Sequence, residues 1–258
     1  FDVAFCDTCI GGSTVATTLA RPGLRAYYLA DYHVNPLGVR GDAEVLAALE
    51  RWVDIASGQA RRMVIACNTA SAKLEAAADV RFRAQELEVE LTSMVDLLDA
   101  SVGKTDLRGE RVCLMGTEYT VSSPVYAERI VSRGARDLVR LAATRTESAI
   151  AHLEHATEAG QEIIRAEIED AIRSVDTVVL ACTCFPLVAD LIRTIKPHVR
   201  LLDPGLEIRS VASWPEREGP NHLTLACSGD AITQDTLQTQ APLLFPGWDE
   251  IEIVSLVD

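Results

Sequence analysis

The sequence predicts an α/β protein with two pseudo-symmetric lobes, each a mainly parallel sheet flanked by helices, with the active site between the lobes. Short apolar runs rich in β-branched residues alternate with segments of helical periodicity, which is typical of this class. The run Met63–Ala66 ends in Cys67-Asn68-Thr69, and Val178–Ala181 ends in Cys182-Thr183-Cys184. The same pattern in each half predicts two related lobes. Each cysteine would lie at the carboxyl end of a strand, where open α/β sheets bind ligands.

The first lobe begins with a strand over Asp2–Cys6, followed by a turn that contains Gly11-Gly12. Glycine allows a sharp turn or a close approach of the backbone to a ligand. A helix carrying Val15 and Leu19 follows, and Leu24–Ala30 reads as the second strand. Punctuated by proline and glycine, residues 31–41 are expected to form a loop.

Asp42 is a plausible N-cap for a helix that places Val45, Leu49 and Trp52 on one side. The strand Met63–Ala66 comes next, and a helix is expected from about Ser71. Residues 100–110 contain Gly, Lys, Thr, Asp and Arg and are expected to connect the lobes.

The alternation of strands and helices then begins again with a strand over Arg111–Met115. A helix covers Ile163–Val175, the second cysteine strand follows it, and another helix carries Leu187, Leu191 and Ile195. Leu201-Leu202 ends at a Pro-Gly turn. Finally, Leu223–Cys227 is a late strand expected to complete the first sheet. The predicted lobes are therefore residues 1–95 with 209–258, and residues 96–208.

Composition narrows the class of partner. The chain has 258 residues, a net charge of −14 and 48% hydrophobic residues. This acidity argues against nucleic acid, which favours clustered Lys and Arg. No apolar run reaches about 18 residues, so no membrane span is expected. The seven cysteines are an odd number in a chain of this length, which favours a reducing cytoplasm over a disulfide framework.

Two thiols on opposite sides of one small molecule could invert a carbon centre by proton transfer. One thiolate removes a proton from one face and the other thiol returns one to the opposite face. A thiol with a pKa of about 8.5 is mostly protonated at neutral pH, so it benefits from a neighbouring proton acceptor. Asp7, at the end of the first strand, could accept the proton of Cys67. Hydroxyl and amide groups that suit a carboxylate or an ammonium group come from Asn68, Thr69, Thr117, Thr120 and Thr183.

Other readings of the cysteines stay open. A buried cysteine is often only a small core residue, and this is the expected role of Cys113 and Cys227. The pair Cys6 and Cys9 could be redox-active, or could bind zinc together with Cys182 and Cys184. The favoured reading has neither a metal nor a cofactor.

Several motifs in order resemble the glutamate racemase family, within the aspartate/glutamate racemase superfamily. The matching segments are Phe5–Val15, Asp31–Gly38, Cys67–Ser71, Thr117–Val121, Cys182–Leu187, Leu202–Gly205 and Ser228–Asp230. Cys67-Asn68-Thr69-Ala70-Ser71 matches the first catalytic motif without change. The likeness covers nearly the whole chain.

The resemblance implies cofactor-independent racemisation of glutamate, which supplies D-glutamate for bacterial peptidoglycan, by an enzyme that is often a homodimer. It implies that Cys67 and Cys182 are the two bases and that Asp7 assists Cys67. A second-lobe carboxylate is also implied, with Glu154 the better match and Glu147 the alternative. The implied substrate-binding residues are Thr8, Leu37, Gly38, Asn68, Thr69, Thr117, Thr120, Thr183 and Cys184.

Two positions depart from the family pattern. Leu37 replaces a tyrosine and Cys184 replaces the histidine of the second motif, and both belong to the expected site. A thiol is a weaker base than an imidazole at neutral pH. The alternatives are therefore a superfamily relative that acts on another small carboxylate, as an isomerase or a decarboxylase, or a non-catalytic ligand-binding homologue.

Overall fold

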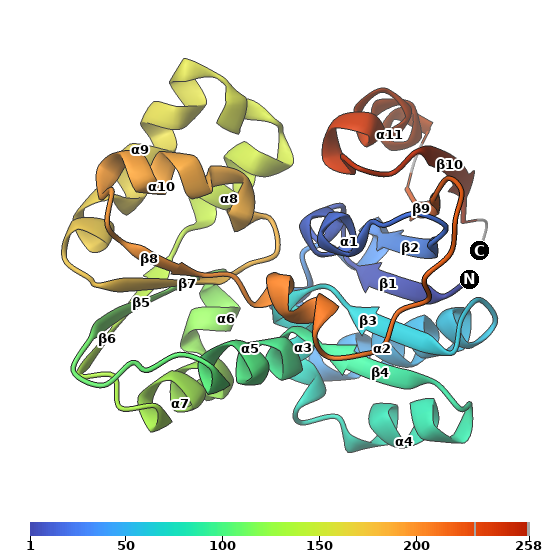
Figure 1. Ribbon diagram of the computed structural model, residues 1–258, viewed down its shortest axis with the longest axis horizontal. Coiled ribbons are helices and arrows are strands. Elements are labelled where there is room, and N and C mark those ends of the chain that lie inside the picture. Colours follow the sequence, from blue (N-terminus) through green and yellow to red (C-terminus); the bar gives the residue numbers. More distant parts are fainter. Residues whose placement is uncertain (230, 257–258) are drawn as a thin grey trace. The chain divides into compact units, whose positions relative to one another are not determined.

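The computed structural model describes residues 1–229 and 231–256 (Figure 1). The chain divides into two compact units. Unit 1 comprises Phe1–Met94 and Ile208–Asp258, and unit 2 comprises Val95–Glu207. Each unit is built on its own parallel sheet with helices on both faces, so the predicted α/β class is confirmed.

Unit 1 contains a six-stranded sheet in the order β10-β9-β2-β1-β3-β4, with every neighbouring pair parallel. Its strands are β1 (Val3–Asp7), β2 (Arg25–Asp31), β3 (Arg62–Ile65), β4 (Glu90–Ser93), β9 (His222–Ser228) and β10 (Glu250–Ser255). The α-helices assigned to it are α1 (Ser13–Leu19), α2 (Asp42–Ser57), α3 (Asn68–Leu74), α4 (Ala78–Glu86) and α11 (Ala231–Leu244). Short 3-10 helices are η1 (Tyr32–Val34), η2 (Leu37–Val39) and η5 (Pro204–Arg209), of which η5 spans the boundary with unit 2.

Unit 2 contains a four-stranded sheet in the order β6-β5-β7-β8, again parallel throughout. Its strands are β5 (Arg111–Gly116), β6 (Asp137–Ala142), β7 (Thr177–Ala181) and β8 (Arg200–Leu202). Its helices are α5 (Met94–Gly103), whose first residue belongs to unit 1, α6 (Glu118–Ser122), α7 (Pro124–Ser132), α8 (Thr144–Ala151), η3 (Glu154–Ala156), α9 (Glu158–Arg173), η4 (Phe185–Val188) and α10 (Ala189–Ile195).

The two sheets share one strand order. If the strands of each unit are numbered from its own first strand, the order is 2-1-3-4 in both cases, and unit 1 adds β9 and β10 beside its second strand. The internal repeat inferred from the two cysteine motifs is therefore present in the topology. In each unit the cysteine follows the third strand, β3 or β7.

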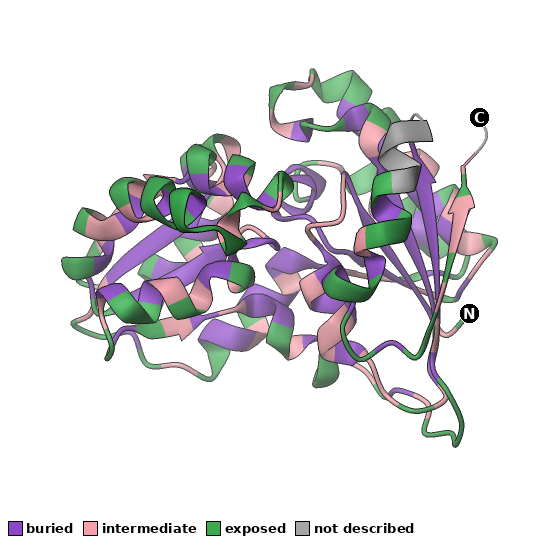
Figure 2. Ribbon diagram, turned by 90° about the horizontal axis from the view of Figure 1, so that it is seen from above, coloured by how far each residue is buried: buried purple, intermediate pink, exposed green. Residues whose placement is uncertain are grey.

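Helices cover both faces of each sheet. In Figure 1, α2, α3 and α4 lie on one face of the unit 1 sheet and α1 and α11 on the other. In unit 2, α8, α9 and α10 lie opposite α6 and α7. Figure 2 shows the consequence, because the central strands are buried while the outer sides of the helices are exposed. Strands covered on both faces are buried along their whole length and are mostly apolar, as in β1 and β7.

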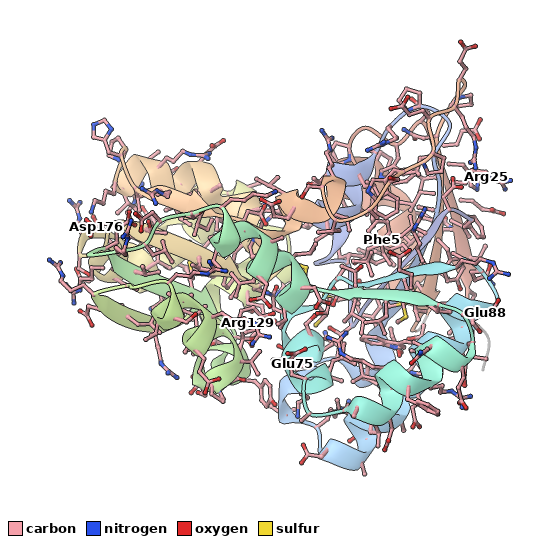
Figure 3. The ribbon with its side chains drawn as sticks, turned by 60° about the horizontal axis from the view of Figure 1, so that its bottom comes forward. Phe5, Arg25, Glu75, Glu88, Arg129 and Asp176 are labelled. Carbon is pink, nitrogen blue, oxygen red and sulfur yellow. The ribbon has the colours of Figure 1, made fainter. Side chains whose placement is uncertain are left out.

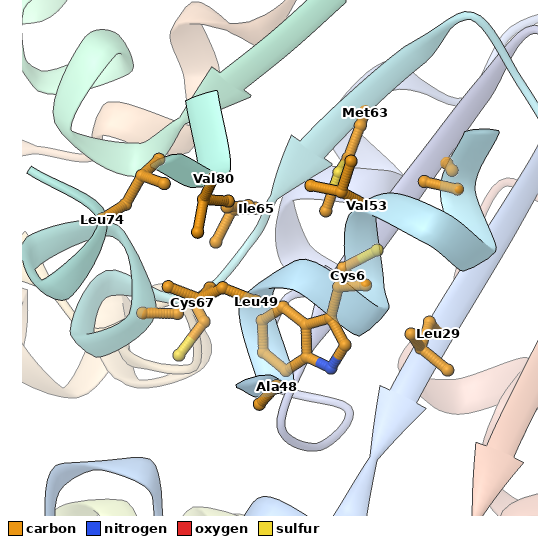
Figure 4. Packing of buried hydrophobic residues seen from close by; sticks show 14 of the residues in the cluster. Cys6, Leu29, Ala48, Leu49, Val53, Met63, Ile65, Cys67, Leu74 and Val80 are labelled. Atoms are coloured by element: carbon orange, nitrogen blue, oxygen red, sulfur yellow. The ribbon is translucent and has the colours of Figure 1, made fainter. Parts of the chain in front are cut away.

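Alternation along β1 sends neighbouring side chains to opposite faces. Phe5 stacks on Tyr28, whose ring meets Phe245 edge-on, and Figure 3 shows Phe5 inside the unit while Arg25 and Glu88 lie at its surface. Cys6 points to the other face, into the apolar cluster beneath α2, α3 and α4. Figure 4 shows Cys6 and Cys67 in this cluster.

The core of unit 2 follows the helical spacing expected for residues 163–175. Ile164, Ile168 and Ile172 recur every four residues along α9 and are fully buried against β5 and β7, whereas Ile163 is exposed. The apolar stripe therefore fixes which side of α9 meets the sheet.

Several elements differ from their predicted form. The edge strands β4, β6 and β10 were not predicted, because charged residues such as Glu90, Arg140 and Glu252 interrupt their apolar pattern. Edge strands tolerate such residues, since one side of the strand faces solvent.

Three element boundaries also differ from those predicted from the sequence. Gly41 is the N-cap of α2, in place of Asp42, which is the first residue of the helix. Helix α3 begins at Asn68, earlier than the Ser71 start that was expected. Helix α5 runs to Gly103, so only the later part of the predicted 100–110 connection is irregular.

A buried carboxylate ties three elements of unit 1 together. Asp31 ends β2 and is fully buried. It forms an ion pair with Arg51, accepts a hydrogen bond from Trp52 Nε1 at 2.6 Å and accepts another from Ser228 Oγ at 3.0 Å. These three donors compensate the free-energy cost of removing the carboxylate from water. Asp31 thereby joins α2 and β9 to the end of β2.

Replacing this carboxylate should destabilise the fold strongly. In Asp31→Asn, an amide group would face donors, and we expect a loss of about 2–4 kcal/mol in the free energy of unfolding. Asp54→Asn is the matched control, because Asp54 pairs with Arg83 on the surface and should contribute less than about 1 kcal/mol. Urea unfolding of both variants checks this, and equal losses would contradict it.

Candidate functional site

The strand order in each unit defines where a ligand would bind. From β1 the chain passes to β2 on one side, and it then crosses to β3 on the other side. Such a reversal is a topological switch point, at which a crevice opens beyond the carboxyl ends of the strands. Asp7 ends β1 and Cys67 follows β3, so both flank this point in unit 1. In unit 2 the same point lies between Thr117 and Cys182.

Asp7 is held by backbone donors of the turn that follows it. Its Oδ1 accepts a hydrogen bond from the Thr8 N–H at 2.7 Å, and its Oδ2 accepts one from the Gly12 N–H at 2.7 Å. The Asp7 side chain is almost fully buried. These two bonds fix the carboxylate at the carboxyl edge of the sheet and shape the turn into α1.

Gly12 is needed because the turn passes very close to β3. A Cβ on Gly12 would lie 2.6 Å from the Cβ of Ala66, 2.7 Å from the Ala66 carbonyl oxygen and 2.8 Å from the Tyr28 hydroxyl. The Tyr28 hydroxyl donates to the Cys9 carbonyl at 3.0 Å, which holds the other side of the turn. The Gly-Gly pair therefore brings the first turn against the residue that precedes Cys67.

Cys67 caps helix α3 with an extended backbone, and its carbonyl accepts from the Ser71 N–H at 2.9 Å. The hydroxyl of Ser71 donates to the Ile65 carbonyl and accepts from the Met94 N–H. Ser71 thus locks α3 to β3 and to the start of α5. Asn68 and Thr69, the next residues after Cys67, are both buried at this corner.

Asp7 and Cys67 interact directly. Burial raises the pKa of Asp7 from 3.8 to about 7, although hydrogen bonds from Gly12, Thr8 and the Cys67 side chain lower it in part. A carboxyl group with a pKa near 7 accepts and releases protons at neutral pH. The Cys67 thiol therefore has a proton acceptor within hydrogen-bonding distance.

The loop that contains Leu37 and Gly38 packs against the same helix. The 3-10 helix η2, which contains Gly38, contacts α3, the helix that follows Cys67. The Leu37 side chain is buried within the apolar cluster of unit 1. The Leu37 side chain therefore stabilises the core and is not available to a ligand.

Thr117 and Thr120 form a small hydroxyl pair after β5. The Thr117 Oγ1 accepts from the Thr120 N–H at 3.2 Å and donates to the Thr120 Oγ1 at 2.9 Å. Gly116 precedes them, and a Cβ there would lie 3.0 Å from the Ala181 carbonyl oxygen. The two threonines are thereby held close to the end of β7, immediately before Cys182.

Cys182 lies in a tight turn together with Cys184. The Cys182 carbonyl accepts from the Phe185 N–H at 3.0 Å, and the two sulfur atoms are 3.3 Å apart. Cys182 is half-buried, whereas Thr183 and Cys184 are buried. The hydrogen bond to Cys184, burial and the Glu147 carboxylate all raise the pKa of Cys182. Cys182 therefore remains a thiol at neutral pH.

The two candidate carboxylates of unit 2 differ in their surroundings. Glu147 lies on α8, is partly buried and acts electrostatically on Cys182. Burial also raises the pKa of Glu147 itself. Glu154 lies in η3 and is exposed. Glu147 is thus the better placed of the two to act beside Cys182.

Other residues of interest lie apart from these clusters. Cys6 and Cys113 are fully buried in apolar clusters, and burial raises the pKa of Cys113 to about 12. Across residues 1–229 and 231–256, no three His, Cys, Asp or Glu side chains converge to hold a metal ion. No helix among these residues is long and apolar enough to cross a membrane. Asp230 of the Ser228–Asp230 motif lies outside the described residues.

Sequence reasoning missed some of the residues that shape the site. Ser71 was noted as part of a motif and as a helix start, but its bridge between β3 and α5 depends on tertiary structure. Tyr28 reads as an ordinary strand residue, and only the fold shows that its hydroxyl supports the Cys9 turn. The Gly11-Gly12 pair was the available signal for the close approach of this turn.

The chain is similar to known racemases. The profile of the Asp/Glu/hydantoin racemase family matches residues 33–208. A glutamate racemase from Desulforudis audaxviator is 30% identical over 210 residues, which cover 79% of this chain and 74% of the relative. One from Lactococcus lactis subsp. cremoris is 26% identical and covers 80% and 75%.

Solved structures show the same fold. The glutamate racemase of Campylobacter jejuni superposes with a TM-score of 0.78 at 22% identity, covering 94% of this chain and 97% of that one. The Escherichia coli glutamate racemase, in complex with L-glutamate and the activator UDP-MurNAc-Ala, gives 0.76 at 21% identity, covering 100% and 99%.

The close approach of the Gly12 turn to Ala66 can be tested by substitution. Gly12→Ala should force the turn away from Ala66 and destabilise the chain by roughly 1–3 kcal/mol. Gly41→Ala is the matched control, because a Cβ at Gly41 meets nothing within 4 Å. Thermal unfolding of the two variants compares them. A Gly12→Ala variant as stable as Gly41→Ala would show that the turn has room for a methyl group.

The raised pKa of Asp7 predicts how the stability of the chain depends on pH. The folded chain keeps a proton on Asp7 up to about pH 7, whereas the unfolded chain releases it near pH 4. Stability should therefore fall as pH rises through this window, by up to about 4 kcal/mol from this group. In Asp7→Asn this contribution should disappear. Urea midpoints at pH 5 and pH 8 measure it, with Asp190→Asn as an exposed control; an unchanged pH slope in Asp7→Asn would refute it.

Proposed function

Because the chain belongs to the Asp/Glu/hydantoin racemase family, we propose that it is a cofactor-independent glutamate racemase with Cys67 and Cys182 as its two bases. The observation that carries this proposal is the repeated placement of a cysteine. Each unit has a 2-1-3-4 sheet, and in each a cysteine follows the third strand at the switch point. The curated relatives named glutamate racemase support glutamate as the substrate.

Racemisation requires a base on one face of the α-carbon and an acid on the other. In one direction the Cys67 thiolate removes the α-proton and the Cys182 thiol donates a proton to the opposite face. In the reverse direction the two thiols exchange roles. Before the forward reaction Asp7 accepts the proton of Cys67, which its pKa of about 7 allows at neutral pH. Afterwards Cys67 carries the α-proton and Cys182 is the thiolate. For the next turnover in the same direction, Asp7 releases its proton to solvent and Cys182 takes one up.

The proposal assigns substrate-binding groups to both halves of the sequence. Thr8, Asn68, Thr69 and the backbone near Gly38 would bind the substrate from unit 1. Thr117, Thr120 and Thr183 would bind it from unit 2. Hydroxyl, amide and backbone N–H groups can hold the substrate carboxylates by charge-assisted hydrogen bonds. Leu37 contributes only its backbone, since its side chain is in the core.

The two halves of the proposed site differ in how they handle protons. Cys67 has a carboxylate partner, whereas Cys182 has a second thiol, Cys184, and the Glu147 carboxylate. A raised pKa suits Cys182 to the role of acid more than to that of base. The enantiomer whose α-proton is removed by Cys67 should therefore exchange that proton faster.

The wider role follows from the reaction. D-Glutamate produced by this enzyme would supply peptidoglycan synthesis, and we place the enzyme in the cytoplasm, in keeping with its seven unbridged cysteines. The net charge of −14 supports a small-molecule substrate rather than nucleic acid. A homodimer is proposed by analogy with the family.

Incubation with L- and D-glutamate in deuterium oxide tests the proposal. We expect each enantiomer to be converted into the other, with deuterium at the α-carbon of the product. Cys67→Ser and Cys182→Ser should each lower the rate of inversion by at least about 100-fold, because a hydroxyl is a much weaker acid than a thiol. Chiral chromatography and NMR measure inversion and exchange.

Cys227→Ala is the matched control, since Cys227 is buried in β9 away from the switch point, and it should keep full activity. α-Proton exchange without inversion would mean that only one thiol works. Neither exchange nor inversion by the folded protein would overturn the assignment to glutamate and direct the search to other small carboxylates.

A further inference from the structure

We propose that Cys182 and Cys184 form a site of reversible oxidation, in which a peroxide converts the two thiols into an intramolecular disulfide. Their sulfur atoms lie 3.3 Å apart in unit 2. The proposal concerns these thiols themselves. Only its consequence for turnover rests on the proposed function of Cys182.

The backbone favours closure of this bridge. Residues 182–185 form a tight turn closed by the hydrogen bond from the Phe185 N–H to the Cys182 carbonyl, and Cys184 is in the right-handed helical region. Two residues separated by one other have Cα atoms at most about 7.6 Å apart, and a turn shortens this distance toward the usual disulfide range of about 4.4–6.8 Å.

The side chains need little movement. A disulfide joins its sulfur atoms at about 2.05 Å, so the pair must approach by roughly 1.2 Å. The two thiols are already hydrogen-bonded to each other. Thr183, the residue between them, is buried.

The chemistry balances with a peroxide as the oxidant. The Cys182 thiolate attacks one oxygen of hydrogen peroxide, the O–O bond breaks, and a sulfenic acid and hydroxide form. The Cys184 sulfur then attacks the sulfenic sulfur, the S–O bond breaks, and the oxygen leaves as water. In sum, two thiols and one peroxide give one disulfide and two waters, with two electrons passing from sulfur to oxygen.

The exposure of the two residues sets the order of these steps. Cys182 is half-buried and can meet a solute, whereas Cys184 is 7% exposed and acts second, as the resolving thiol. Because the thiolate is the nucleophile and the pKa of Cys182 is raised, oxidation should be slow at pH 7 and faster at pH 9.

Mass spectrometry of the full chain tests the site directly. Trypsin releases residues 174–193 as one peptide that contains both cysteines and no internal Lys or Arg. After treatment with hydrogen peroxide and then a thiol-alkylating reagent, this peptide should lack two hydrogen atoms and carry no alkyl group. Treatment with dithiothreitol should restore two alkylatable thiols.

Two variants control the experiment. In Cys184→Ser the loss of two hydrogens should disappear, and peroxide should instead add oxygen atoms to Cys182. Cys113→Ala removes a buried core thiol of the same unit and should leave the disulfide unaffected. The proposal is overturned if the wild-type peptide keeps two alkylatable thiols, gains oxygen without a disulfide, or is bridged to another cysteine.

Turnover of glutamate is a separate readout. If Cys182 is a base of the racemase, the disulfide should abolish inversion, and dithiothreitol should restore it. A disulfide that forms while inversion continues would uphold the oxidation site and contradict the role of Cys182. The two hypotheses can therefore fail independently.

Discussion

The buried carboxylate of Asp7 sets the geometry on which the rest of unit 1 depends. It is desolvated at the end of β1, and the N–H groups of Thr8 and Gly12 compensate part of that cost by binding one oxygen each. Those bonds require the turn to fold back, and the turn can do so only because Gly12 has no side chain where Ala66 and Tyr28 approach. A single electrostatic requirement thus fixes a turn, a glycine and the distance from β1 to the strand that carries Cys67.

The two units use one topology but provide their cysteines with different surroundings. Cys67 contacts a carboxylate that titrates near neutrality, whereas Cys182 contacts another sulfur. The scaffold constrains where a side chain is placed, through strand order and turn geometry. It does not constrain the neighbour that tunes the pKa of that side chain. A fold can therefore repeat within a chain while the chemistry at equivalent positions diverges.

Sequence patterns predicted the buried strands well, because residues such as those of β3 and β7 must be apolar when helices cover both faces. They missed β4, β6 and β10, whose charged residues are permitted by exposure at an edge. The motifs singled out Cys67, Cys182 and Asp7, and Gly11-Gly12 marked the turn. They could not show that Ser71 bridges two elements or that Leu37 packs into the core. Nor could they show that the charge of Glu147 raises the pKa of Cys182, whereas Glu154 is exposed. Those facts depend on contacts between segments far apart in the chain.

The addition of β9 and β10 to unit 1 has a consequence for biosynthesis. Residues 95–207 of unit 2 are contiguous, so this unit can complete its sheet as soon as it leaves the ribosome. In unit 1, β2 pairs with β9, whose residues are made after the whole of unit 2. Until then the outer edge of β2 has unpaired N–H and C=O groups, and such edges readily join foreign strands. This edge of the nascent chain is thus open to misassembly throughout the translation of unit 2, and shielding of the edge by a chaperone would matter most at that stage.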